Sequence, residues 1–461
     1  MCVWKCGEFA ESYGGGRCPI GCWRRRKDTS MTAEQIVDEL SACVKGLGEK
    51  VQGRSELSIG EAVLLAMPLV RRLGELLVGW LCEVGSRYDR AECPKCGRRM
   101  RRWGHRPRTV MTWFGPVRLR VPRLRCGECG EEASPLLERS RLRCGCTPEV
   151  WTEVVEEAAG DPYREVEARL ARFGIEVSDS TVEALVKEVG GELSAREAAE
   201  AEAAARLESV PHSERCPERL YVSVDMRSVR VDGDWREVKV AAFGETPVCG
   251  CDADGEPPKL ERVSSFSYFG GVDEFMRRVY VELVRRGVWQ AREVVLVADG
   301  AAWIWDRLPG LVPLGTKTVE VLDFYHAAEN LQKAVTAVYG EDGAEGRAWF
   351  EALRDRLRRG LWRQVTEQLA AWAERPLGSE RQKVVANALA YFRGHRHRMR
   401  YLGLAADGYQ IGSGVVESQC KRLGQRIKGP GMNWTPEGLA ALLAVNNHCQ
   451  RQPTTPLAKA A

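Results

Sequence analysis

Apolar residues recur at the spacing of an amphipathic helix from about residue 32 to about residue 90. The stretch EAVLLAMPLVRRLGELLVGWLCEV keeps this spacing throughout, which predicts a long helix with one apolar face. Thr32 and Gln35 have the separation of a capping box, in which each side chain accepts a hydrogen bond from the other residue's backbone N–H. The pattern therefore predicts an N-terminal helical region over residues 31–90.

An alternating pattern follows in TVMTWFGPVRLRVPRL, and it breaks at Gly115 and Pro116. Alternation on both sides of such a break is typical of a β-hairpin. A CxxC pair followed by glycine stands at each end of this hairpin. The four cysteines are Cys93, Cys96, Cys126 and Cys129.

The two pairs have the spacing of zinc knuckles, in which glycine lets backbone amides turn toward the thiolates. We interpret the cysteines as metal ligands and not as disulfides, because Met1–Arg26 lacks the apolar segment of an export leader. Four thiolates leave no open position on a tetrahedral ion, so we expect a structural Zn²⁺ in a zinc ribbon over residues 91–146. Cys144 and Cys146 form an alternative ligand pair or bind nothing.

Three helical patterns occupy residues 147–193. Pro148 stands at the start of the first, and Ser178 or Ser180 can cap the third. A helix, a short turn with glycine and a capped helix is the helix-turn-helix pattern, although the acidic third helix fits a plain helical bundle equally well. The Ala- and Glu-rich segment over residues 194–216 predicts a helical linker.

From residue 219 the pattern changes to apolar runs separated by helical segments, which predicts a mixed α/β sheet. Three predicted strands end in an acid: RLYVSVDM at Asp225, REVVLVADG at Asp299 and TKTVEVLDFYH at Asp323. A fourth, WREVKVAAFGE, follows the turn VDGD. One more acid, Glu417, follows the glycine-rich turn in GYQIGSGVVESQCKRLGQR, among the basic residues of a predicted helix.

Carboxylates that follow neighbouring strands and a later helix can converge at one edge of a sheet. Three convergent acids supply the hard oxygen ligands that two Mg²⁺ or Mn²⁺ ions need. Such ions polarise an attacking water or hydroxyl and stabilise the leaving oxygen in phosphodiester transfer. The pattern therefore suggests a two-metal site for that chemistry.

The distribution of charge along the chain indicates what kind of partner the protein binds. The chain of 461 residues carries a formal net charge of only +4, yet basic residues crowd 98–108 and 393–400, and acids crowd 149–215. Localised basic patches suggest a polyanion partner, although solvated surface would also explain them. No run of about 18 apolar residues predicts a membrane span. Residues 1–30 are Gly- and Cys-rich and are predicted to be a disordered leader or an upstream start-site extension.

The chain resembles the DDE transposases of bacterial insertion sequences, in particular the ISKra group. The resemblance is carried, in this order, by VSVDM, WREVKVAAFGE, VLVADGAAWIWD, LDFYHAAENLQKAV and GYQIGSGVVESQCKRLGQRIKGPGMNWTPEGLAALLAV. It runs from the zinc ribbon to about Asn447. It implies a multidomain α+β protein whose RNase H-like catalytic core, residues 217–328 and 408–450, surrounds an all-helical insertion at residues 329–407.

The resemblance also implies the site. Asp225 would bridge two Mg²⁺ (or Mn²⁺) ions per active site, Asp299 would hold one ion and Glu417 the other. Asp323 is the competing choice for the second acid. If Asp299 holds that place, Asp323 and His326 would support the site by organising it or by contacting a phosphate. His326 is equally well explained as a helix N-terminal residue bonded to its neighbours.

The implied function is transposition. The protein would bind the terminal inverted repeats of its element, cut a phosphodiester bond to free a 3′-OH, and use that hydroxyl to attack target DNA. Synapsis of two ends implies a homodimer or higher oligomer, in a bacterial-type cytoplasm at the nucleoid. Trp434 would either pack under its helix or stack on a flipped base. The predicted DNA contacts are Lys421, Arg422, Arg426, Lys428, Trp434, Arg101, Arg102 and Arg396.

The chain departs from the family's pattern in places. Met226 stands where glycine is common after the first acid, Asn446 and Asn447 stand where Leu-Arg is common, and the tail over residues 451–461 lacks an aromatic end. The alternative function is therefore a domesticated or decayed transposase that acts as a zinc-containing DNA-binding regulator without catalysis. A third is a related nuclease that cleaves DNA without strand transfer.

Overall fold

A computed structural model describes residues 32–52, 56–85, 91–206, 213–250, 257–341 and 343–451. The chain divides into two compact units, Met1–Gly145 and Cys146–Ala461. The predicted leader and nearly all of the predicted tail lie outside the described residues. Among the described helices, none combines the length and the apolar character needed to cross a membrane.

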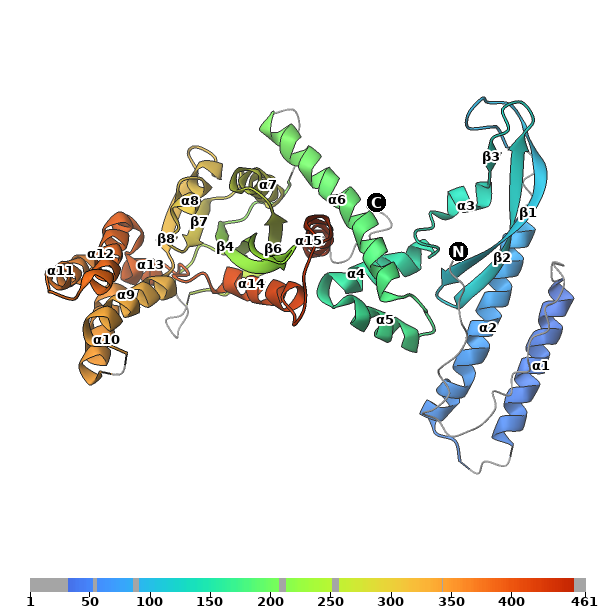
Figure 1. Ribbon diagram of the computed structural model, residues 1–461, viewed down its shortest axis with the longest axis horizontal. Helices are drawn as coiled ribbons and strands as arrows, with labels where there is room; N and C mark the ends of the chain where they lie inside the picture. The colour runs from blue at the N-terminus through green and yellow to red at the C-terminus, as the bar shows by residue number, and fades with distance from the viewer. Residues whose placement is uncertain are drawn as a thin grey trace. The chain divides into compact units, whose positions relative to one another are not determined.

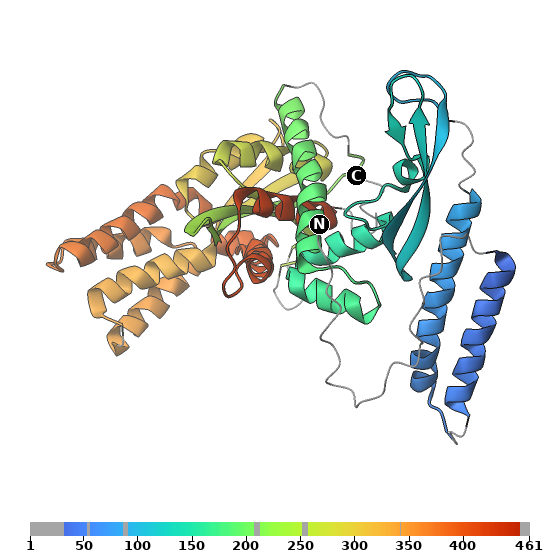
Figure 2. The same cartoon turned by 45° about the vertical axis from the view of Figure 1, so that its right-hand side comes forward.

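The first unit begins with two helices that lie side by side (Figures 1 and 2). The predicted capping box is confirmed at the start of α1, where Thr32 Oγ1 accepts from Gln35 N at 3.3 Å and Gln35 Oε1 accepts from Thr32 N at 2.9 Å. The elements of this unit are α1 (Ala33–Val51), α2 (Ile59–Gly85), β1 (Met100–Thr112), β2 (Gly115–Cys126), β3 (Glu132–Ala133) and α3 (Pro135–Ser140).

The predicted hairpin between the cysteine pairs is confirmed. β1 and β2 pair antiparallel from Met100 opposite Cys126 to Thr112 opposite Gly115, and β3 pairs with the other edge of β2. Gly115 has a φ of 102°, in the left-handed region that favours glycine. One face of the hairpin is packed against α2 and α3, and its core consists of Val110, Val117, Leu119 and Val121.

Three helices open the second unit, as the sequence predicts: α4 (Pro148–Gly160), α5 (Tyr163–Arg172) and α6 (Asp179–Ala205). Ser178 caps α6, because its Oγ accepts from Thr181 N at 3.2 Å. α6 runs without interruption across the predicted boundary at residues 193–194, which corrects that boundary. The Ala-rich half is helical, as predicted, and it also packs: Ala201 and Ala204 are buried, and α6 contacts two later helices, α7 and α15. The helix-turn-helix interpretation stays a prediction.

A five-stranded mixed sheet forms the centre of the second unit, in the order β6-β5-β4-β7-β8. β4, β5 and β6 are antiparallel, whereas β4, β7 and β8 run parallel. The sequence did not indicate β6, because its serines interrupt the apolar run. The strands are β4 (Arg219–Val231), β5 (Asp234–Thr246), β6 (Glu261–Phe269), β7 (Glu293–Ala298) and β8 (Lys317–Leu322).

Helices flank the sheet on both faces. On one face, Leu220, Val222 and Leu296 pack with apolar residues of α7, while Tyr221, Val295 and Val297, on the alternate positions, belong to a second core formed with later helices. The helices are α7 (Val272–Arg285), α8 (Ala302–Trp305), α9 (Phe324–Tyr339), α10 (Ala344–Arg358), α11 (Trp362–Ala373), α12 (Ser379–Gly394), α13 (Tyr401–Ala406), α14 (Gly414–Ile427) and α15 (Pro436–Arg451), with 3₁₀ turns η1 (Leu308–Leu311) and η2 (Arg396–Arg398).

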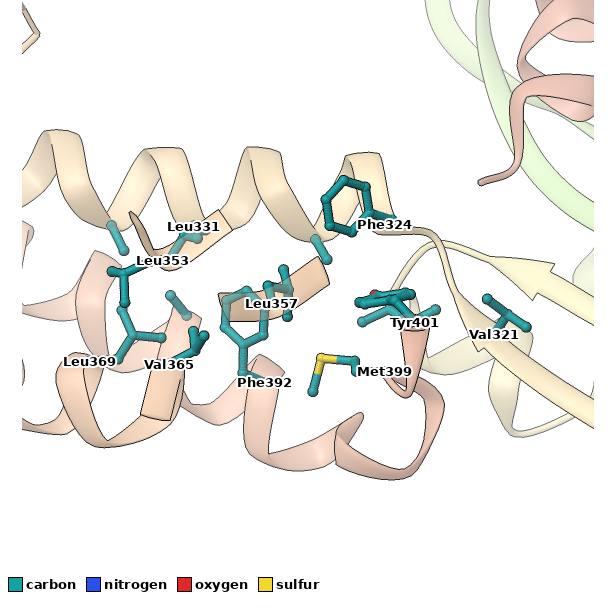
Figure 3. Packing of buried hydrophobic residues seen from close by; sticks show 14 of the residues in the cluster. Val321, Phe324, Leu331, Leu353, Leu357, Val365, Leu369, Phe392, Met399 and Tyr401 are labelled. Carbon is teal, nitrogen blue, oxygen red and sulfur yellow. The ribbon is translucent and has the colours of Figure 1, made fainter. Parts of the chain in front are cut away.

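The helical segment predicted between the two parts of the core is present. α9 begins at the sheet and continues into a bundle with α10, α11 and α12 (Figure 1). Figure 3 shows how Leu331, Leu353 and Leu369 meet inside this bundle, while Val321 and Phe324 continue the same core toward the sheet. The bundle is therefore joined to one face of the sheet by a shared core.

Candidate functional site

Three acids occupy equivalent positions on three adjacent parallel strands. The register pairs Val224 of β4 with Ala298 of β7, and Ala298 with Leu322 of β8. The next residue on each strand is an acid, namely Asp225, Asp299 and Asp323. Because neighbouring strands lie about 4.8 Å apart, the fold places these acids in a row.

The expectation that β4 ends at Asp225 is corrected. β4 continues to Val231, and Asp225 lies opposite Val240 of β5 within the antiparallel ladder. Only the parallel pairing with β7 stops at Val224. Asp225 is therefore held in the interior of a strand by pairing on one side, while its other side meets the loop that begins at Asp299.

Asp299 is the acid whose charge the fold disfavours. Burial raises its pKa, and the carboxylates of Asp225 and Asp323 add to the shift. Asp299 Oδ1 accepts one hydrogen bond, from Ala301 N at 3.0 Å. A cation between the acids would offset this repulsion, as divalent metals do in carboxylate sites.

Asp323 differs from its neighbours because its oxygens are already occupied. Oδ1 accepts from Tyr325 N at 2.6 Å and from His326 N at 3.1 Å, which caps α9. Oδ2 accepts from Ser413 N at 2.7 Å and from the Ser413 hydroxyl. The side chain is also buried. Through these hydrogen bonds, Asp323 joins the start of α9 to the start of α14.

The hydrogen bonds between Asp323 and Ser413 fix the start of α14 and therefore the position of Glu417. Ser413 precedes α14, and its carbonyl oxygen accepts from Glu417 N at 3.1 Å. α14 packs on β4 and β5, and its first turn presents an exposed Glu417. Gly412 in the turn before it lies close to Tyr325: a Cβ there would be 2.7 Å from the ring, so a larger residue would displace that exposed side chain.

Cys420 connects Glu417 with the sheet. It lies one turn further along α14 and is buried; burial raises the pKa of its thiol, and the carboxylates of Asp225 and Glu417 add to the shift. Both acids therefore lie near one sulfur atom. Sequence analysis missed Cys420 and Ser413, although their places in GSGVVESQC, one helical turn either side of Glu417, were a usable signal.

The carboxylates do not form a tight cluster of their own. In the described part of the chain, the group of His, Cys, Asp or Glu ligand atoms that lie within 4.8 Å of one another is the set of four cysteines. Two-metal sites hold their ions about 3.5–4 Å apart, so their outermost ligands lie further from each other than the ligands of a single ion.

His326 adds a positive charge to this row of acids. Its Nδ1 lies 3.3 Å from Asp323 Oδ2, and that carboxylate raises the pKa of His326 to about 9, with further contributions from Glu329 and Asp299. The imidazole is therefore protonated at neutral pH. It can balance carboxylate charge or attract a phosphate.

The predicted DNA contacts fall into two groups. Six of the side chains are on exposed residues, namely Lys421, Arg422, Lys428, Arg101, Arg102 and Arg396. Arg426 is only 4% exposed and donates from Nε to Ala158 O at 2.9 Å, so the prediction that it contacts DNA is corrected. Trp434 is packed: its Nε1 donates to Ile427 O at 2.9 Å, and its ring meets the edge of Tyr163. Of the two predicted roles of Trp434, packing beside the helix is the one observed.

The four cysteines of the first unit form the cluster whose ligand atoms could hold a metal ion. Cys93 Sγ lies 3.5 Å from Cys129 Sγ, and Cys96 Sγ lies 3.5 Å from the sulfurs of Cys126 and Cys129. Four sulfurs bound to zinc at 2.3 Å would stand about 3.8 Å apart, so the spacing fits such an ion. Cys144 and Cys146 are not part of the group.

The backbone of the cluster has the predicted knuckle geometry. Gly97 N donates to Cys93 O at 2.9 Å, and Gly130 N donates to Cys126 O at 3.1 Å. Backbone N–H groups of Cys129 and Glu128 lower the pKa of Cys126, whereas burial and the neighbouring sulfurs raise the pKa of Cys96, so Cys126 is the more readily ionised of the two. These residues could therefore hold a metal such as zinc.

Comparison with known proteins adds no assignment: no protein-family model matches the chain, and no curated protein matches it.

Proposed function

We propose that the protein is a metal-dependent DDE transposase with an RNase H-like catalytic core. The observation that carries the proposal is the row of Asp225 and Asp299 at equal positions on the adjacent parallel strands β4 and β7. A helix with an acid in its first turn packs on the same strand, as the third ligand of such a site requires. The strand order β6-β5-β4-β7-β8, with β4 central, is also that expected of an RNase H-like sheet.

In this proposal Asp225, Asp299 and Glu417 bind two Mg²⁺ or Mn²⁺ ions. Asp299 is preferred to Asp323 as the second acid because Asp323 accepts four hydrogen bonds and Asp299 Oδ1 accepts one. Bound ions would activate the nucleophile and stabilise the leaving oxygen. The residues of the chain hold the carboxylates in place, and His326 would offset negative charge.

The proposed reaction consists of two successive displacements at phosphorus. Water attacks a phosphodiester at the element end, the bond from phosphorus to the 3′-oxygen breaks, and that oxygen leaves as a 3′-OH. The 3′-OH then attacks a phosphodiester of target DNA, whose own 3′-oxygen leaves with a proton. Water and DNA supply both nucleophiles, so no covalent bond between protein and DNA forms.

The partners follow from this chemistry. The element's terminal inverted repeats and a target duplex are the proposed DNA partners, and bringing two ends together requires at least two copies of the chain. The exposed Lys421 and Arg422 on α14, one turn beyond Glu417, are well placed for the phosphates beside the proposed scissile bond. A structural zinc ion in the cysteine cluster is part of the same proposal.

Cleavage of end-labelled duplexes taken from the DNA flanking the gene tests the proposal. Asp225→Asn, Asp299→Asn and Glu417→Gln should each reduce Mg²⁺-dependent cleavage by at least about a hundredfold while leaving DNA binding intact, because each removes a metal ligand. Asp234→Asn, at the exposed first residue of β5, is the matched control and should cleave normally. Normal cleavage by a triad variant would remove that residue from the site.

The same assay separates the alternative functions. Binding without cleavage by the unaltered protein would favour a DNA-binding regulator. Cleavage without joining of the freed 3′-OH to a second duplex would favour a nuclease.

A further inference from the structure

A pocket of about 170 Å³ opens on the hairpin of the first unit, in the corner between the β1–β2–β3 sheet and α3. It is distinct from the cysteine cluster and from the row of acids. The walls that matter for its chemistry are formed by Arg106, Arg108, Arg123, Glu132, Ser134 and Leu137.

Strand register explains why three arginines meet there. Arg106 lies opposite Val121 and Arg108 opposite Leu119, so both share a face with the apolar core of the hairpin. Arg123, two residues beyond Val121, shares the same face from β2. The apolar core is covered by α2 and α3, whereas Arg106 and Arg108 lie beyond this cover and are exposed.

The charges in the pocket do not balance. Arg123 pairs with the carboxylate of Glu132, the acid on the pocket wall. Within the described residues, neither Arg106 nor Arg108 has a carboxylate at ion-pair distance. Three guanidinium groups therefore face one carboxylate. This leaves a surplus of two positive charges on exposed side chains, which an anion can approach.

We propose that this pocket binds one phosphate group of a DNA backbone, held by Arg106 and Arg108. A guanidinium group matches a phosphate through two parallel N–H donors, so the two arginines can hold one phosphodiester group between them. Val121 and Leu137 form the apolar part of the same wall. The sugar-phosphate backbone of DNA can reach the pocket because β1 is exposed on both faces from Arg101 to Thr109.

The inference rests on the proposed DNA partner and deepens it, but it does not depend on catalysis. It assigns to the ribbon a defined phosphate contact, in addition to the general attraction of its basic strands. Arg101 and Arg102, the contacts predicted from the sequence, are outside the pocket.

Salt-dependent binding by the full chain tests the proposal, with a short fluorescein-labelled duplex of mixed sequence in Mg²⁺-free buffer. The double variant Arg106→Gln/Arg108→Gln should bind at least about tenfold more weakly. Its dependence of log affinity on log salt should also become shallower by about 0.9, the value for one phosphate. Arg118→Gln is the matched control, because Arg118 lies opposite Thr109 and so on the other face of the same hairpin.

The result that overturns the proposal is a double variant that matches Arg118→Gln or the unaltered protein in affinity and salt dependence. Circular dichroism and zinc content establish that the variants are folded. A second arm adds inorganic phosphate at constant ionic strength. Stabilisation of the unaltered protein by free phosphate, with DNA binding unchanged in the double variant, would also overturn a backbone contact. Failure of the proposed function would appear separately, as absence of cleavage with Mg²⁺.

Discussion

At the scale of single residues, the three acids on adjacent strands take different roles because their hydrogen-bond partners differ. Asp323 bonds two amides of α9 and both donors of Ser413, which leaves it a structural residue. Asp299, its neighbour on β7, has one such partner and a raised pKa. Sequence alone offered both as the second acid, and could not separate them because the donors of Ser413 lie 90 residues away.

His326 makes the stability of the second unit depend on pH. Its pKa is about 9 in the folded chain and about 6.5 when unfolded, so the ion pair with Asp323 stabilises the fold fully below about pH 6.5. This contribution is lost as the pH rises through about 9. Denaturant unfolding followed by tryptophan fluorescence should show stability falling over that range, and His326→Gln should remove this fall. An unchanged pH dependence in the variant would contradict the assigned pKa.

At the scale of elements, α14 combines a basic exposed face with a buried arginine. The guanidinium group of Arg426 lies beside the rings of Tyr163 and Trp434, at 4.9 and 5.3 Å from their centroids, and donates to a carbonyl in the last turn of α4. Lys421, on the same helix, is exposed. The sequence showed two similar cations, and only the packing of α4 and α5 distinguishes them.

Arg426→Gln and Lys421→Gln should therefore have opposite consequences. The first should lower the free energy of unfolding by about 1–3 kcal/mol, since it removes a buried charged donor and its ring contacts. The second should leave stability nearly unchanged and weaken DNA binding, with the salt dependence shallower by about 0.9. Thermal unfolding and salt titration of the two variants give the comparison. Equal stability of both variants would argue against the buried role.

Local signals in the sequence predicted those elements that depend on nearby residues. The Thr32 capping box, the hairpin that turns before Gly115 and the four-cysteine cluster all follow from short-range geometry. The sequence did not indicate β6, whose polar face is stabilised by contacts such as Ser267 N donating to Asn447 Oδ1 at 2.8 Å. The continuity of α6 was missed for the same reason, because helices distant in sequence bury its Ala-rich half.

At the scale of the whole molecule, two units carry different chemistry. The first has a four-cysteine cluster and an arginine-lined pocket on one hairpin. The second has the acids, the helix that carries Glu417 and a helical bundle sharing a core with the sheet. In the proposed transposase, the first unit binds DNA phosphates, and the second unit holds the metal ions that act on the scissile phosphates.

The central claim is that Asp225, Asp299 and Glu417 together hold two divalent metal ions. Electron paramagnetic resonance of Mn²⁺, titrated into the full chain with duplex DNA present, measures this directly. The unaltered protein should bind two Mn²⁺ ions per active site, and Asp225→Asn, which removes the proposed bridging ligand, should lose both. Binding of the same number of ions by Asp225→Asn and the unaltered protein would contradict the account.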